Sequence, residues 1–156
     1  LPPRSCQQAH ARGALMDWQI SPGAALIQLQ ATMAWADAGA GSSRLQIFTS
    51  AQPAPGDAAG AAPQVEFVLA KPCGVITDGV WSLIAAEPGG TMVLVNGIPR
   101  WGRWLTAAGA WVADGDVTDL AGGGAIRIAG GATPEGDNSP MLYAGGLAIL
   151  GATAFT

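Results

Sequence analysis

The densest group of side chains suited to molecular recognition lies in the segment PRWGRW, which runs from Pro99 to Trp104 and is followed by Trp111. Alternate side chains of an extended strand point to opposite faces, so Trp101 and Arg103 share one face and Trp104 points to the other. We expect one indole in the core and the other exposed beside a guanidinium, within reach of a cation–π contact. Exposed Trp and Arg anchor many protein interfaces, and indole rings also bind sugars. We therefore predict an interface at Trp101, Arg103, Trp104 and Trp111, with core packing and sugar binding as the alternatives.

Side chains that commonly carry catalysis are scarce in this chain. It has one His, one Lys, one Tyr and two Cys, at His10, Lys71, Tyr143, Cys6 and Cys73. Acid/base, nucleophilic and metal chemistry needs several such groups to converge, so we predict a protein without enzymatic activity, cofactor or metal ion. The cysteines form no C-x-x-C motif, and we interpret them as buried free thiols, while a disulfide between them stays open.

Three aspartates in the segment DGDVTD, at Asp114, Asp116 and Asp119, offer the oxygen ligands that Ca²⁺ prefers. The EF-hand pattern fails, because Asp119 occupies the position that requires Gly and Ala125 the position that requires a bidentate Glu. An irregular metal site is the alternative. We interpret the segment as a polar turn whose carboxylates accept hydrogen bonds from nearby backbone N–H groups. The following run GGGAIRIAGG lacks the Lys of a phosphate-binding loop and indicates turns around a strand.

The overall composition argues against several classes of function. Only 12% of the 156 residues are charged, and 7 Lys and Arg against 11 Asp and Glu give a net charge of −4. Without a basic surface to neutralise phosphates, nucleic acid is not expected as a partner. No run reaches the roughly 18 apolar residues of a membrane span, so no membrane association is predicted either. The 23 Gly and 11 Pro favour many turns over long helices.

Apolar residues recur with a period of two along much of the chain, which predicts strands. From Ala25 to Trp35 the odd positions are apolar, and several of the even ones are polar, so we predict a half-buried strand over 25–35. Further strands are predicted at 44–49, 64–70, 75–76, 80–85, 91–95, 100–106, 111–113, 125–129 and 147–154.

Turn signals separate these strands. The dipeptide Asn96-Gly97 favours a type I′ turn, so a hairpin is expected between residues 91–95 and Ile98. The Pro-rich segment 51–63 is expected to be a surface loop. About nine short strands at close spacing predict an all-β fold, either an antiparallel β-sandwich, a jelly roll or a small barrel. Sheet edges so poor in charge invite pairing with other chains, and we expect an oligomer.

Two parts of the chain differ in composition. Residues 1–15 are predicted to be a flexible N-terminal extension that contains His10, and residues 16–156 a single β domain. The extension lacks the apolar core of a secretory signal. Three interpretations stay open for it: a processed segment, an arm that docks on a partner, or translated sequence upstream of a start at Met16.

The C-terminal half, residues 96–150, contains a group of turn-rich motifs: Trp101-Gly102-Arg103-Trp104, Gly109, the segment 112–119, the glycines before Ile126, and Leu142-Tyr143-Ala144-Gly145-Gly146. Through these residues it resembles small virion proteins of tailed bacteriophages. The resemblance implies a structural protein of the phage head, such as a capsid decoration or cement protein, located in the virion. Its implied partners are its own copies and the major capsid protein or another virion protein. It brings no catalytic or cofactor residues.

Two other classes of function stay open beside this one. A carbohydrate-binding β-sandwich module would use an exposed Trp as a sugar platform, and a glycan would quench the fluorescence of that Trp. An enzyme would need a pocket in which distant carboxylates such as Glu66 and Asp78 converge.

Overall fold

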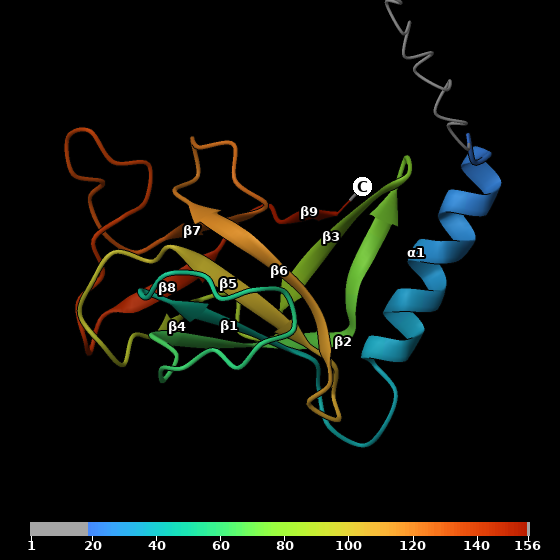
Figure 1. Cartoon of the computed structure of the whole chain (residues 1–156), viewed down its shortest axis with the longest axis horizontal. Coiled ribbons are helices and arrows are strands. Elements are labelled where there is room, and N and C mark those ends of the chain that lie inside the picture. Colours follow the sequence, from blue (N-terminus) through green and yellow to red (C-terminus); the bar gives the residue numbers. More distant parts are fainter. Residues whose placement is uncertain (1–18, 156) are drawn as a thin grey trace, which may run out of the picture.

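A computed structural model of the chain describes residues 19–155 and contains, within that range, one helix and nine strands (Figure 1). The predictions for residues 1–15, including those for Cys6 and His10, lie outside the described residues. The elements are α1 (Pro22–Ala36), β1 (Arg44–Phe48), β2 (Val65–Thr77), β3 (Val80–Ala85), β4 (Thr91–Met92), β5 (Trp101–Leu105), β6 (Trp111–Thr118), β7 (Ile126–Ala129), β8 (Leu147–Leu150) and β9 (Ala154–Phe155).

The strands form one curled sheet in the order β4-β8-β7-β6-β5-β1-β2-β3-β9, which has the shape of a half-barrel. The prediction of a β-rich fold is confirmed. Two parts of it are wrong: the fold contains a helix, so it is not all-β, and β6 pairs with β7 in parallel, so the sheet is mixed rather than antiparallel.

The parallel pair arises from a short loop that wraps around one side chain. β6 and β7 overlap only at two pairs, Val117 with Ile126 and Thr118 with Arg127, so a seven-residue connection is enough to join them. Thr118 fills the centre of this loop, and its Oγ1 accepts a hydrogen bond from the backbone N–H of Gly124 at 3.2 Å. A Cβ at Gly124 would lie 2.7 Å from the Thr118 side chain, so the glycine is required by this close approach.

The predicted strand over 25–35 is wrong, because Pro22–Ala36 forms α1. Ser21 caps the helix by accepting a hydrogen bond from the backbone N–H of Ala24 at 3.1 Å, and Pro22 occupies the first turn, where its missing N–H costs nothing. Two of the five even positions in 25–35, Leu26 and Ala34, are also apolar, so the alternation is incomplete, and the helix start signal at Ser21 and Pro22 outweighs it. Ala, Leu, Gln and Met, which favour helices, make up most of the segment.

The predicted hairpin at Asn96-Gly97 is also wrong. Strand β4 does not pair with Ile98; it pairs with β8, and Gly97 forms a bridge with Leu142. Gly97 has a φ of 145°, so the glycine is needed for its backbone, as the turn motif suggested. The dipeptide instead contacts a segment that is distant in the sequence. Asn96 Oδ1 accepts a hydrogen bond from the backbone N–H of Ala144 at 2.7 Å.

Buried Gln64 links this crossing segment to the other end of the sheet. Its side chain is 1% exposed, and its Nε2 donates to the carbonyl oxygens of Val95 at 3.0 Å and Gly97 at 2.8 Å. The backbone N–H of Leu94 in turn donates to the carbonyl of Gln64 at 2.8 Å. These bonds connect the chain after β4 to the start of β2, and so partly close the curled sheet.

The core lies on the concave face of the sheet and is organised around two indoles. Trp81 and Trp104 meet edge to face with centroids 4.5 Å apart, and Trp104 Nε1 donates to Ser43 Oγ at 2.6 Å. The remaining core residues are mostly aliphatic, with Phe67 the only other aromatic. They include Leu45, Ile47, Val65, Phe67, Leu69, Val93, Val117, Ile126, Ile128 and Leu142.

Candidate functional site

The four residues predicted as an interface lie on β5 and β6, and three of them are buried. Trp101 is 1%, Trp104 2% and Arg103 7% exposed, whereas Trp111 is 42% exposed. The expectation that one indole of the PRWGRW segment is exposed is therefore wrong. The alternation of faces is confirmed, because Arg103 lies 5.3 Å from the Trp101 ring while Trp104 packs in the concave core.

Trp101 is buried because the outer face of the sheet has its own cover. Phe48 of β1 stacks on Trp101 with centroids 4.5 Å apart and an interplanar angle of 17°. The Pro-rich loop 51–63 passes over this face (Figure 1), and the carbonyl of Asp57 accepts a hydrogen bond from Arg103 Nη1 at 2.7 Å. The prediction of a loop at 51–63 is confirmed, and the loop covers the predicted interface.

Arg103 is fully engaged inside the chain. Its Nε and Nη2 donate to the two oxygens of Asp114 at 2.7 and 2.8 Å, a bidentate arrangement of two nearly buried groups. The hydrogen bonds to Asp114 raise the pKa of Arg103 above its ordinary value. Trp111 Nε1 donates to the same carboxylate at 3.1 Å. This group therefore ties β5, β6 and the loop together; Arg103 and Asp114 are nearly buried, and the Trp111 ring is 42% exposed.

The aspartates of DGDVTD also have internal partners. Asp116 Oδ1 accepts from the backbone N–H of Ala125 at 3.0 Å, and Asp119 Oδ1 accepts from Gly122 at 2.8 Å. A hydrogen bond from Thr133, at 2.6 Å, is the main reason that the pKa of Asp119 lies below its ordinary value. The backbone bonding predicted for this segment is confirmed at Asp116 and Asp119. The prediction of a turn is wrong for residues 114–118, because β6 extends through Thr118.

Lys71 and Cys73 hold the connection between α1 and the sheet. Lys71 Nζ donates to the carbonyls of Gly39 and Gly41, and the backbone N–H of Cys73 donates to Asp37 Oδ2 at 2.9 Å. Cys73 is a buried free thiol, as predicted, and burial together with the Asp37 carboxylate raises its pKa to about 12. A thiol with this pKa stays protonated and is a poor nucleophile.

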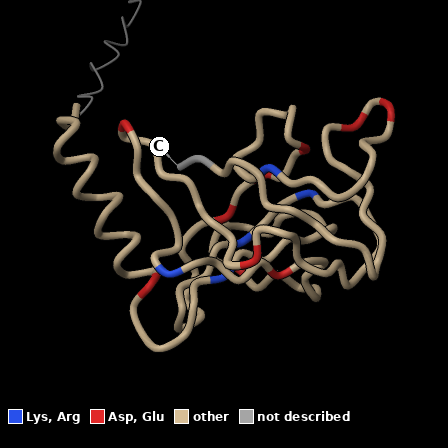
Figure 2. The backbone as a smooth tube through the Cα atoms, turned by 180° about the vertical axis from the view of Figure 1, so that it is seen from behind, with Lys and Arg blue, Asp and Glu red and all other residues tan. Residues whose placement is uncertain are grey.

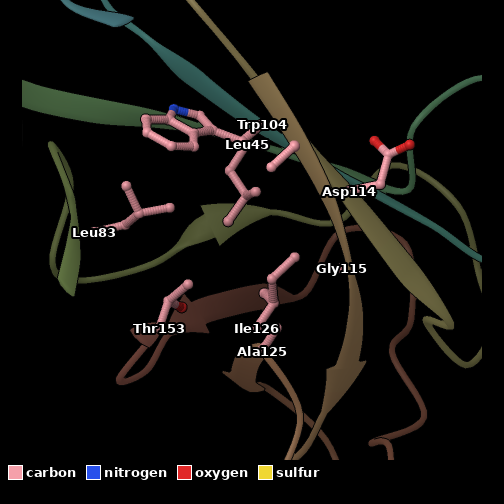
Figure 3. Close-up of a pocket in the computed structure, with 9 residues that line it drawn as sticks. Leu45, Leu83, Trp104, Asp114, Gly115, Ala125, Ile126 and Thr153 are labelled. Atoms are coloured by element: carbon pink, nitrogen blue, oxygen red, sulfur yellow. The ribbon is translucent and has the colours of Figure 1, made fainter. Parts of the chain in front are cut away.

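The carboxylates that an enzyme would need do not converge in the part of the chain that the structure describes. Glu66 and Asp78 lie at opposite ends of β2. A cavity of about 40 Å³ with mostly apolar walls lies beside Trp104. Figure 3 shows the side chains that line it. The size of this cavity suits a packing gap rather than a substrate, because ligand pockets usually exceed roughly 300 Å³. A larger cavity of about 300 Å³ lies beside α1, and no described Asp, Glu, His, Cys or Lys lines it; its lining residues are Ile20, Ala25, Gln28, Leu29, Thr32, Gly79 and Trp81. Over residues 19–155 no group of three or more His, Cys, Asp or Glu side chains is placed to hold a metal ion.

Sequence reasoning missed two exposed apolar surfaces. The helix surface consists of Ile20, Leu26, Ile27 and Trp35, which are 55%, 38%, 66% and 50% exposed. Residues 20–36 contain no charged side chain, and Figure 2 shows α1 without charge along its length. The absence of charge was visible in the sequence. Because a strand was predicted over 25–35, however, the residues that share one face of a helix were not recognised as a surface.

The second surface, called the edge surface below, surrounds β4 and β8. It lies in two further segments without charged side chains, 88–99 and 138–151. Met92 and Leu147 are direct cross-strand partners, so their side chains lie on the same face. The edge surface consists of Met92, Leu94, Val95, Tyr143, Leu147 and Ile149, each between 43% and 63% exposed.

Comparisons of the chain with protein-family models, curated proteins and solved structures found no match. Among the described residues, no helix has the length and apolar character needed to span a membrane.

Proposed function

We propose that the chain is a non-enzymatic structural protein of a tailed-phage virion, a head-associated accessory such as a capsid decoration or cement protein. It acts by packing against its own copies and against the major capsid protein or another virion protein. The observation that carries this proposal is the pair of exposed, charge-free apolar surfaces on α1 and around β4–β8. Contiguous exposed apolar surface of this kind marks protein interaction sites in soluble domains.

The use of the polar side chains supports packing over catalysis. Arg103, Asp114 and Lys71, which have the chemistry to bind a substrate, instead hold the loop 51–63 and the helix connection in place. The rigid body that results presents apolar rather than reactive groups to its surroundings. Polar side chains that bond within the fold and apolar side chains on the surface suit a protein that packs against other subunits.

The proposal replaces the interface first predicted at Trp101, Arg103 and Trp104 with the helix and edge surfaces. Trp111 alone of the four keeps an exposed ring for a partner. We also assign the fold to the small-barrel alternative rather than to a sandwich or jelly roll. The single curled sheet and its partial closure through Gln64 favour this assignment.

Quantitative mass spectrometry of purified virions from a phage that encodes the chain tests the proposal. We expect a copy number equal to that of the major capsid protein or a simple fraction of it. The matched control is a virion preparation from a phage that lacks the gene. If the chain is absent from intact particles that contain the normal amount of capsid protein, the proposal is wrong.

A separate measurement addresses the carbohydrate-binding alternative through Trp111. Glycans of several classes are titrated into the full chain while Trp fluorescence is followed. Quenching that disappears in Trp111→Ala and persists in Trp35→Ala would favour a sugar platform at β6. We expect no such quenching.

A further inference from the structure

Three dipeptides in the described part of the chain place a Gly directly after Asp or Asn: Asp78-Gly79, Asn96-Gly97 and Asp114-Gly115. Such a pair can react with itself in water. The backbone nitrogen of the Gly attacks the side-chain carbon Cγ and a succinimide ring closes, with loss of water from Asp or of ammonia from Asn. Gly favours the attack because it has no side chain to hinder its nitrogen. The reaction needs a free nitrogen, a free side chain and a backbone that can move, so the fold selects among the sites.

The Asp78-Gly79 site meets these requirements. Both residues are exposed and form the turn between β2 and β3, which Figure 1 shows at the outer tip of that hairpin. Their φ angles of 52° and 77° are those of a type I′ turn. Thr77 and Val80 close the ladder, so the Gly79 N–H lies outside it. Neither this N–H nor the Asp78 carboxylate has a hydrogen-bond partner among the described residues.

The Asn96-Gly97 site has both reacting groups bonded. Asn96 Oδ1 accepts a hydrogen bond from the backbone N–H of Ala144 at 2.7 Å. The Gly97 N–H donates to the carbonyl of Leu142 at 3.0 Å. A Cβ on Gly97 would lie 2.9 Å from Thr49 Cγ2, so its backbone is closely surrounded. The attack therefore requires that this bridge open first, although an amide reacts faster than a carboxyl group in an unfolded chain.

The Asp114-Gly115 site is held inside a strand. Both carboxylate oxygens of Asp114 accept hydrogen bonds from Arg103, at 2.7 and 2.8 Å. Gly115 is paired with Gly102 in the ladder between β5 and β6. Loss of a carboxyl oxygen as water would break the nearly buried ion pair. Among these dipeptides, the turn between β2 and β3 is the one that is free to react in the folded chain.

We propose that Asp78-Gly79 is a site of self-modification in the folded chain. The Gly79 nitrogen forms a bond to Asp78 Cγ, and the hydroxyl of the protonated carboxyl group leaves with the proton of that nitrogen as water. Water then reopens the ring at either of its carbonyl groups. One opening returns Asp, and the other gives isoaspartate, in which the backbone runs through the former side chain. No co-reactant other than water is needed, so the reaction does not depend on the proposed function.

Isoaspartate changes the turn without changing its charge. The carboxylate is kept, but the backbone becomes longer by one carbon atom. A two-residue type I′ turn has a fixed geometry that matches the twist of its strands, so the added atom disturbs it. We expect the hairpin of β2 and β3 to loosen from its tip. Gly79 also lines the cavity beside α1, so the wall of this cavity changes with it.

The variant Asp78→Asn tests the site against a matched dipeptide in the same molecule. Asn also accepts a positive φ, so the turn is retained, and residues 78–79 and 96–97 then have the same sequence. The folded full chain is incubated at neutral pH, and mass spectrometry of its peptides locates the loss of ammonia. We expect position 78 to react at least about tenfold faster than position 96, which must open locally first. In urea the two rates should become similar. Equal rates in the folded chain would overturn the proposal.

The unmodified chain is tested directly after the same incubation. An endoprotease that cleaves before Asp but not before isoaspartate, together with a methyltransferase specific for isoaspartate, locates the product. We expect it at position 78, with Asp114 intact. Gly79→Asn tolerates the positive φ but hinders the nitrogen, so it should slow the reaction several-fold, and circular dichroism verifies its fold. If the chain forms isoaspartate at 78 in urea but not when folded, the turn is not reactive and the proposal is wrong.

Amide hydrogen exchange tests the structural consequence. The incubated chain is compared with fresh chain, and we expect faster exchange in residues 74–83 and unchanged exchange in residues 101–118. Exchange that is equally unchanged in both segments, in a chain shown to contain isoaspartate, would contradict the loosening of the hairpin.

Discussion

The outer face of β5 and β6 and the surface of α1 differ in an unexpected direction. The face with charged and aromatic side chains is largely buried, whereas the uncharged helix surface is exposed. The first contains two Arg-bonded aspartate oxygens, the indoles of Trp101 and Trp111 and a cation–π contact, yet Trp101 and Arg103 are almost fully buried. The second has no charge at all, yet Ile27 and Trp35 are half exposed or more. In this molecule, the side chains that best suit recognition stabilise the fold, and apolar side chains are exposed instead.

The cause of this difference is cover supplied by distant parts of the chain. Arg103 is held by Asp57, 46 residues earlier, and Trp101 by Phe48 on the neighbouring strand. α1 packs mainly on β2 through one side, and Ile27 and Trp35 of this helix are 66% and 50% exposed. Residue type therefore says little about interface location until the loops have been placed.

The largest expected effect tests whether Trp101 belongs to the fold as much as Trp104 does. Trp101→Ala and Trp104→Ala should each lower the free energy of unfolding by about 3 to 5 kcal/mol, because each removes a buried indole. Urea unfolding followed by circular dichroism measures this. A large loss for Trp104→Ala with almost none for Trp101→Ala would return Trp101 to the interface and undo the comparison.

The Arg103–Asp114 pair gives the next largest effect. Arg103→Met keeps much of the apolar stem but leaves the nearly buried Asp114 with only Trp111 as a side-chain partner, so we expect a loss of about 2 kcal/mol. Arg100→Met is the matched control, because its ion pair with Asp137 is more exposed and should contribute less than about 1 kcal/mol. Equal losses for both variants would contradict a special structural role for the buried pair.

A smaller effect is expected at the start of α1. Ser21→Ala removes the side-chain cap on the Ala24 N–H and should cost about 1 kcal/mol of helix stability. Amide hydrogen exchange of residues 24–28 measures this locally. Ser21→Asp, which retains a capping oxygen, should restore the protection, and protection unchanged in Ser21→Ala would show that the cap does not stabilise the helix.

The smallest effect concerns pH and the loop after β6. Because the pKa of Asp119 is lower in the folded chain than its ordinary value, its stabilising effect is complete above that value and is lost as the pH falls through the folded pKa. The Tm of Asp119→Asn should therefore be below that of the unmodified chain at pH 7, and the difference should shrink below about pH 4. Glu135→Gln removes an exposed carboxylate as a control. A Tm difference independent of pH would rule out this cause.

Some features of the fold could be predicted because they depend on neighbours in the sequence. The strand at 80–85 and those close to 44–48 and 126–129 are short apolar alternations bounded by Gly, Pro or Ser, and the structure has strands there. The backbone bonding of Asp119 depends on residues two and three positions away, so its carboxylate was enough to indicate it. The opposite faces of Trp101 and Trp104 follow from the geometry of an extended chain.

The sequence by itself therefore determined short strands, turns and alternating faces, since local backbone preferences and side-chain periodicity are properties of adjacent residues. Only the tertiary structure decided that Asn96-Gly97 crosses to Leu142 instead of closing a hairpin, that loop 51–63 bonds to the buried Arg103, and that α1 exposes Ile27 and Trp35. The first two depend on contacts with segments tens of residues away, and the third depends on which side of α1 packs on the sheet. Burial is a property of the whole packed chain, and no local pattern contains it.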